Sequence, residues 1–139
     1  MSTANFPITI FHNLNCGTSR NVVAAVREAG YEPTVVEYLK AGWTREQLLD
    51  LSAKSGESLR DLMRDKGTPA AELGLLEPSA TDEQILAAMV EHPILVNRPI
   101  VVSPKGVALC RPSEKVFPLL DKVPDSFTKE DGEVVSTRG

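Results

Sequence analysis

The segment around Cys16 constrains the fold of this chain most, because it joins a short apolar run to an amphipathic one. Residues 8–11 are predicted to form a strand. After the cysteine, apolar residues recur at helical spacing up to Gly30, which can end the helix. Thr18 or Ser19 can cap its first turn. The sequence therefore predicts a strand, a polar turn that holds Cys16, and a helix that begins directly after it.

Its position makes Cys16 a candidate nucleophile. The unpaired N–H groups and the positive dipole end of a helix N-terminus favour thiolate over thiol, and they can also hold an oxyanion. His12 lies four residues before the cysteine and Arg20 four residues after it, which adds two groups that suit a reactive thiol. The alternative is that Cys16 is a small buried apolar residue, the commoner role of a free cysteine.

The composition suits a single domain. A chain of 139 residues with 42% apolar residues can bury one sizeable core, so we expect one domain over residues 1–139. The sequence has no run of eighteen apolar residues and no charged-then-apolar leader, so we expect a cytoplasmic protein without a membrane partner. The formal charge of −4 offers no basic surface, so nucleic-acid binding is not expected.

The middle of the chain is predicted to be helical. Residues 35–39 read as a second strand, parallel to the first because a helix joins the two. From about residue 44 to residue 92 the signals are all helical, and we expect a helical insertion within the one domain. Capping residues predict the starts of three helices and of one single turn, namely Thr44, Ser58 and Thr81 for the helices and Thr68 for the turn.

A hairpin is predicted after the insertion. Residues 94–102 are strongly apolar, but Pro99 lacks the ladder donor, so this segment should be a turn that enters a strand. Residues 103–106 fit a tight turn, and residues 107–110 should return antiparallel.

The end of the chain is predicted to hold one helix and a tail. Ser113 can cap this helix, which Pro118 should kink or shorten. From Asp125 the sequence is polar and contains glycine, and we expect a mobile C-terminal tail. The order βαβ, helical insertion, ββα predicts an α/β, thioredoxin-like fold with a mixed four-stranded sheet.

Six segments resemble, in the same order, the glutaredoxin-dependent arsenate reductases of the ArsC type. They are HNLNCGTSRN, LRDLMRDKG, AELGL, HPILVNRPIVV, LCRPSE and FTKEDGE. The resemblance covers residues 8–132 and implies the same thioredoxin-like fold. Two positions depart from the family pattern. Leu14 stands where the family usually has proline, which would loosen the turn, and Pro118 falls inside the last helix.

The resemblance also implies a substrate site. The oxyanion-binding arginines of the family fall on Arg64, Arg98 and Arg111, and a planar guanidinium can donate two parallel hydrogen bonds to an oxyanion. Each arginine lies at the end of a predicted element, where its charged head can stay hydrated until it binds the oxyanion. The alternative for each is a solvated surface charge that has no part in substrate binding. The family's cis proline, which faces the active-site cysteine, falls on Pro99.

Four other residues carry groups that could act in or near such a site. His12 matches the family's histidine beside the cysteine, where a cationic or hydrogen-bonding imidazole would favour the thiolate, and a purely structural histidine is the equal alternative. Ser19 stands where a dithiol oxidoreductase has its second cysteine, which removes the simple C-x-x-C mechanism. Cys110 is expected to pack rather than to act as a resolving thiol. His92 suits a helix C-terminus and is assigned no catalysis. No metal or nucleotide site is expected.

The resemblance implies an oxidoreductase that reduces arsenate. The Cys16 thiolate would attack arsenate, glutathione would attack the adduct, glutaredoxin would remove the glutathione, and arsenite would leave. Arsenate, glutathione and glutaredoxin are thus the expected partners, with glutathione as reductant and no bound cofactor. The alternative is a regulator of the same fold that binds RNA polymerase. Such regulators often carry C-x-x-C and lack the full arginine set, whereas this chain has Ser19 and all three arginines.

Overall fold

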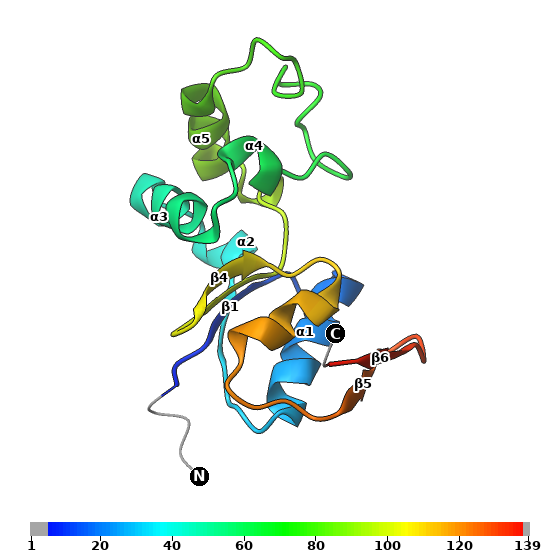
Figure 1. Ribbon diagram of the computed structural model, residues 1–139. Coiled ribbons are helices and arrows are strands. Elements are labelled where there is room, and N and C mark those ends of the chain that lie inside the picture. The colour runs from blue at the N-terminus through cyan, green and yellow to red at the C-terminus, as the bar shows by residue number, and fades with distance from the viewer. Residues whose placement is uncertain (1–5, 138–139) are drawn as a thin grey trace. The chain divides into compact units, whose positions relative to one another are not determined.

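The computed structural model describes residues 6–137 (Figure 1). The chain forms two compact units, one made of the residues up to Glu37 together with those from Arg98 onward, the other of Tyr38–Asn97. A single domain over the whole chain stays a prediction. The elements in chain order are β1 (Thr9–His12), α1 (Gly17–Glu28), β2 (Thr34–Glu37), α2 (Tyr38–Ala41), α3 (Arg45–Ser55), α4 (Leu59–Leu62), α5 (Asp82–Glu91), η1 (Pro93–Leu95), β3 (Ile100–Ser103), β4 (Gly106–Leu109), η2 (Ser113–Leu119), β5 (Ser126–Thr128) and β6 (Val134–Ser136).

The first unit contains a four-stranded mixed sheet in the order β2-β1-β3-β4. β1 and β2 run parallel because α1 connects them, whereas β1–β3 and β3–β4 are antiparallel pairs. Ile10 lies opposite Val35 on one side and Val101 on the other. This sheet and its connections confirm the predicted thioredoxin-like order.

Both ends of helix α1 are well defined, and its N-terminal end positions Cys16. The helix ends at Glu28 with Ala29 as the C-cap, and Gly30 follows with a φ of 100° that suits glycine. The Gly30 and Tyr31 N–H groups donate to carbonyls of the last turn. At the other end Cys16 itself takes the N-cap position. The predicted cap by Thr18 or Ser19 is wrong, because both residues lie inside α1, and the Ser19 hydroxyl bonds to His12 at the end of β1 and to the Asn13 N–H.

One face of the sheet is covered by α1 and η2, as Figure 1 shows. η2 differs from the predicted α-helix, since it is a 3₁₀ helix with Pro118 in its last turn. The predicted cap by Ser113 is wrong, because Pro112 occupies the N-cap position. The core on this side joins buried residues of α1, the strands and η2, including Ile10, Val22, Val26, Val101, Val116 and Phe117.

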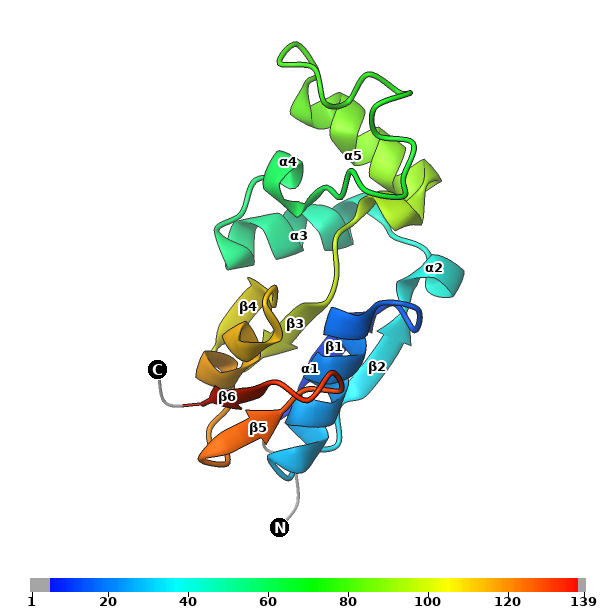
Figure 2. The same ribbon diagram turned by 90° about the vertical axis from the view of Figure 1, so that its right-hand side faces the viewer.

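The segment after Asp125 is folded, which corrects the predicted mobile tail. Strands β5 and β6 pair antiparallel, with Phe127 opposite Val135. Both of these side chains are buried in the core of the first unit, and Figure 2 shows the hairpin beside α1. The alternation of one apolar residue between polar neighbours in each three-residue strand was too short a signal to predict this hairpin. Residues 138–139 lie outside the described part of the chain.

The second unit packs α3, α4 and α5 against one another. Thr44 and Thr81 each form a capping box with the glutamine three residues later, and Ser58 caps α4, as predicted. The predicted strand over residues 35–39 is partly wrong. It ends at Glu37, and the next residue begins α2, where the buried Tyr38 donates to the Val96 carbonyl at 2.6 Å.

Among the helices of residues 6–137, none has both the length and the apolar character needed to cross a membrane.

Candidate active site around Cys16

The loop between β1 and α1 is closed by its own hydrogen bonds. The Cys16 N–H donates to the Asn13 carbonyl at 3.0 Å, and the Asn15 N–H donates to the Asn13 side chain at 2.9 Å. Asparagine readily makes such local bonds to the backbone, so its residue type could have indicated a role for Asn13 that the sequence analysis missed. The loop is therefore well bonded even though Leu14 replaces the family's proline.

Two of the three predicted arginines lie at Cys16. Arg111 NH1 approaches Cys16 Sγ at 3.4 Å, and the same NH1 donates to the Arg98 carbonyl at 2.9 Å. The Arg98–Pro99 bond is cis, as the resemblance implied, and so is Arg111–Pro112. These two arginines come from the ends of the β3–β4 hairpin, which places both beside the start of α1.

Arg98 is buried, with 9% of its surface exposed. The alternative of a solvated surface charge is therefore wrong for this residue, and so is the expectation that its head stays hydrated. The prediction missed this because the burial of a residue at a strand end depends on what packs over it, which the local pattern does not contain.

The surroundings of Cys16 favour its thiolate. Burial raises the pKa of the Cys16 thiol, but hydrogen bonds from the Ser19 N–H and from the Arg111 and Arg98 side chains lower it further than burial raises it, and the pKa lies below its ordinary value. Cys16 is 8% exposed. Cys16 is thus both buried and activated as a thiol. The two interpretations from the sequence, a nucleophile and a small buried residue, are therefore compatible.

Ser19 and His12 form a buried pair beneath the loop. The Ser19 hydroxyl bonds to His12 Nδ1 and accepts a hydrogen bond from the Asn13 N–H at 3.1 Å. Burial lowers the pKa of His12, which favours the neutral imidazole near pH 7. The cationic role considered for His12 is therefore not supported. Its hydrogen bond to Ser19 supports a role in holding the first turn of α1.

Arg64 belongs to the second unit. Its Nε donates to the Lys66 carbonyl at 3.1 Å and its NH1 to Asn97 Oδ1 at 3.2 Å. Asn97 directly precedes Arg98 in the chain. A role for Arg64 in binding the substrate stays a prediction.

The second cysteine has the surroundings of a packing residue. Cys110 is fully buried, and burial raises the pKa of its thiol to about 12. Its Sγ lies 3.7 Å from the Ala108 carbonyl. A thiol this weakly acidic is a poor nucleophile near neutral pH, which agrees with the expectation that Cys110 packs.

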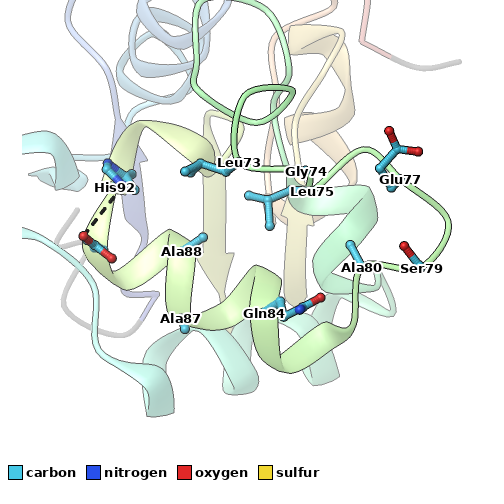
Figure 3. Close-up of a pocket in the computed structure, with 11 residues that line it drawn as sticks. Leu73, Gly74, Leu75, Glu77, Ser79, Ala80, Gln84, Ala87, Ala88 and His92 are labelled. Carbon is cyan, nitrogen blue, oxygen red and sulfur yellow. Dashed lines mark ion pairs between the residues drawn. The ribbon is translucent and has the colours of Figure 1, made fainter.

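A hollow of about 640 Å³ lies in the second unit between α5 and the preceding turns (Figure 3). Leu73, Leu75 and His92 are among the residues that line it, and His92 Nε2 lies 4.0 Å from a carboxylate oxygen of Glu91. None of the predicted site residues lines this hollow, so its size does not make it the reaction site. Within residues 6–137, no group of three or more His, Cys, Asp or Glu side chains is arranged to hold a metal ion.

Comparisons with known proteins identify the family of the chain. A family model described as the ArsC family matches residues 11–117. The arsenate reductase ArsI2 of Synechocystis sp. is 59% identical over 129 residues, which cover 92% of this chain and 92% of that protein. An arsenate reductase of Rhizobium meliloti is 56% identical over 136 residues, or 95% of each chain. The solved structure of an arsenate reductase from Vibrio cholerae has 35% identity and a TM-score of 0.78, covering 83% of this chain and 98% of its own. The chain therefore belongs to the ArsC family.

Proposed function

We propose that this protein is an arsenate reductase in which Cys16 is the nucleophile. The observation that carries the proposal is the contact of Arg111 with Cys16 Sγ at 3.4 Å, together with the lowered pKa of that thiol. A thiolate beside cationic donors can attack the central atom of an oxyanion that the same donors bind. The similar proteins named arsenate reductase support arsenate as that oxyanion.

The first step forms a covalent adduct. The Cys16 thiolate attacks arsenic, a sulfur–arsenic bond forms, and one arsenic–oxygen bond breaks as that oxygen is protonated and leaves as water. No oxidation state changes in this step. Arg98 and Arg111 are suited to bind the remaining oxygens, because guanidinium groups match two oxygens of a tetrahedral anion at once. Arg64 is proposed as the third of these arginines.

The second step requires an external thiol. Glutathione attacks the sulfur of Cys16, the sulfur–arsenic bond breaks, and its electron pair stays on arsenic, which reduces As(V) to As(III). Arsenite leaves, and Cys16 remains as a mixed disulfide with glutathione, which glutaredoxin then reduces. Ser19 at the resolving position and the raised pKa of Cys110 support an external reductant. We also propose a cytoplasmic location, which the proposed use of glutathione supports because the cytosol is the compartment that keeps thiols reduced.

A coupled assay tests the activity. With glutathione, glutathione reductase and glutaredoxin present, we expect NADPH consumption that depends on arsenate and on the protein. The Cys16→Ser variant should show none, while Cys110→Ala should keep most of it. A wild-type protein that binds arsenate without any turnover would contradict the proposal.

The reductant is tested separately. Arsenite production is measured with the glutathione and glutaredoxin system and, in parallel, with thioredoxin alone, while intact mass reports adducts on the protein. We expect a glutathione adduct on Cys16 and poor turnover with thioredoxin. Full turnover with thioredoxin, together with a Cys16–Cys110 disulfide, would overturn the reductant and leave the substrate unaffected.

A further inference from the structure

The C-terminal hairpin contacts the start of α1 through Glu130, which lies in the turn between β5 and β6. The Glu130 carboxylate accepts two hydrogen bonds from Arg20, one from NH2 at 2.7 Å and one from Nε at 3.2 Å. These bonds also lower the pKa of Glu130, so the carboxylate is ionised at neutral pH. A guanidinium held at two of its nitrogens by one carboxylate has a fixed orientation.

The remaining nitrogen of Arg20 holds the cysteine loop. Its NH1 donates to the Leu14 carbonyl at 2.9 Å, two residues before Cys16. The Leu14 side chain does little to fix this peptide by packing, since the residue is 60% exposed. Arg20 therefore ties the exposed side of the loop to α1, and Glu130 determines how Arg20 is oriented.

The hairpin is anchored independently of Arg20. Phe127 is buried and packs edge-on against Phe117, with ring centroids 6.2 Å apart. The Glu130 N–H donates to Asn21 Oδ1 at 2.9 Å, which fixes the hairpin turn to α1 one residue beyond Arg20. The backbone of Glu130 is thus held in place before its side chain acts.

We propose that Glu130 is a positioning residue for Cys16, acting through Arg20 to keep the loop in the conformation that presents the thiol to Arg111. The side chains of Arg20 and Glu130 are 43% and 47% exposed, so this ion pair contributes little to folding stability. Its effect is on orientation, and small displacements of a reacting group reduce rates strongly. The inference deepens the proposed function, but labelling of Cys16 tests it without arsenate, so the two can fail separately.

The Glu130→Ala variant separates orientation from charge, because the two effects move the Cys16 pKa in opposite directions. Removing a carboxylate near the thiolate would by itself lower the Cys16 pKa. Loosening the loop weakens the hydrogen bonds to Cys16 Sγ and raises the pKa. We expect the pH midpoint of iodoacetamide labelling to rise, and kcat for arsenate to fall about tenfold with little change in KM.

Glu133→Ala is the matched control, since it removes a carboxylate of the same hairpin that lies 3.3 Å from Lys129 and does not bond to Arg20. Its labelling midpoint should equal that of the wild type. In an Arg20→Ala background, Glu130→Ala should no longer raise the midpoint, because Glu130 acts on the loop only through Arg20 and the effect of charge alone lowers it.

Melting temperatures of all variants identify any loss that comes from unfolding. If Glu130→Ala does not fold, Glu130→Gln replaces it with the same expected direction. A midpoint that falls or stays unchanged on loss of the carboxylate would overturn the proposal. An equal rise of the labelling midpoint from Glu130→Ala in the wild-type and the Arg20→Ala backgrounds would overturn it as well.

Discussion

Arg111 connects Cys16 to the residue before Pro99. Its NH1 lies 3.4 Å from Cys16 Sγ and donates to the Arg98 carbonyl at 2.9 Å. The group that stabilises the thiolate is thus held in place by the backbone of a second arginine of the site. Its orientation, and not only its charge, should therefore matter for activity.

Replacing Arg111 by lysine tests this orientation. Lysine keeps the positive charge but cannot reproduce the planar arrangement of donors, so we expect kcat/KM for arsenate to fall about a hundredfold. The Cys16 pKa should rise. The control is Arg27→Lys on α1, because Arg27 makes an exposed ion pair with Glu32 at 3.5 Å. Activity of Arg111→Lys within twofold of wild type would contradict the assignment.

Arg98→Lys should lower both activity and stability. Lysine replaces the buried Arg98 guanidinium, which hydrogen-bonds to Cys16, by a smaller ammonium group without the same geometry, and a buried group that loses a hydrogen bond costs about 1–3 kcal/mol. Urea unfolding measures this cost and the coupled assay measures the activity. An unchanged free energy of unfolding would show that the burial of Arg98 has no energetic role.

Cys110→Ala should keep most of the activity. The change removes one buried sulfur that is close in size to a methylene group, and we expect a loss of about 1 kcal/mol in the free energy of unfolding. Cys16→Ser should abolish arsenate reduction without a comparable loss of stability. Equal loss of activity in both variants would point to a disulfide between the two cysteines.

His12 should make the protein less stable at low pH. Burial lowers its pKa in the folded state, so between that value and the ordinary value near 6.5 the unfolded chain binds more protons. The stability that His12 contributes is therefore present above pH 6.5 and is lost as the pH falls towards the folded pKa. The difference in free energy of unfolding between wild type and His12→Gln should shrink from pH 7.5 to pH 5. The same difference at both pH values would contradict this account.

The sequence predicted the elements whose signals are local. The capping residues Thr44, Ser58 and Thr81 begin helices where expected, and Gly30 directly follows the C-cap of α1, because each of these effects depends on a few neighbouring residues. The Cys16 loop belongs to the same group. A strand, a polar turn and an amphipathic helix give the thiol its place at a helix N-terminus whatever the rest of the chain does.

The features that the sequence missed depend on distant contacts. Tyr38 reads as a strand residue, but its hydroxyl bonds to Val96, 58 residues away, and it begins α2. The burial of Arg98 and the pairing of Arg20 with Glu130, 110 residues apart, are of the same kind. No local pattern contains such contacts, since tertiary packing overrides propensity.

The protonation of Cys16 tests the account most directly. The rate of iodoacetamide labelling at Cys16 is measured against pH by mass spectrometry of the labelled peptide, with Cys16→Ser as the control for labelling elsewhere. Because the Ser19 N–H, Arg111 and Arg98 lower the pKa of this thiol more than burial raises it, we predict a midpoint clearly below the free-thiol value of about 8.5 in wild type and a higher midpoint in Arg111→Lys. A midpoint at the ordinary value, unchanged in Arg111→Lys, would contradict the activated thiolate on which the proposed reaction depends.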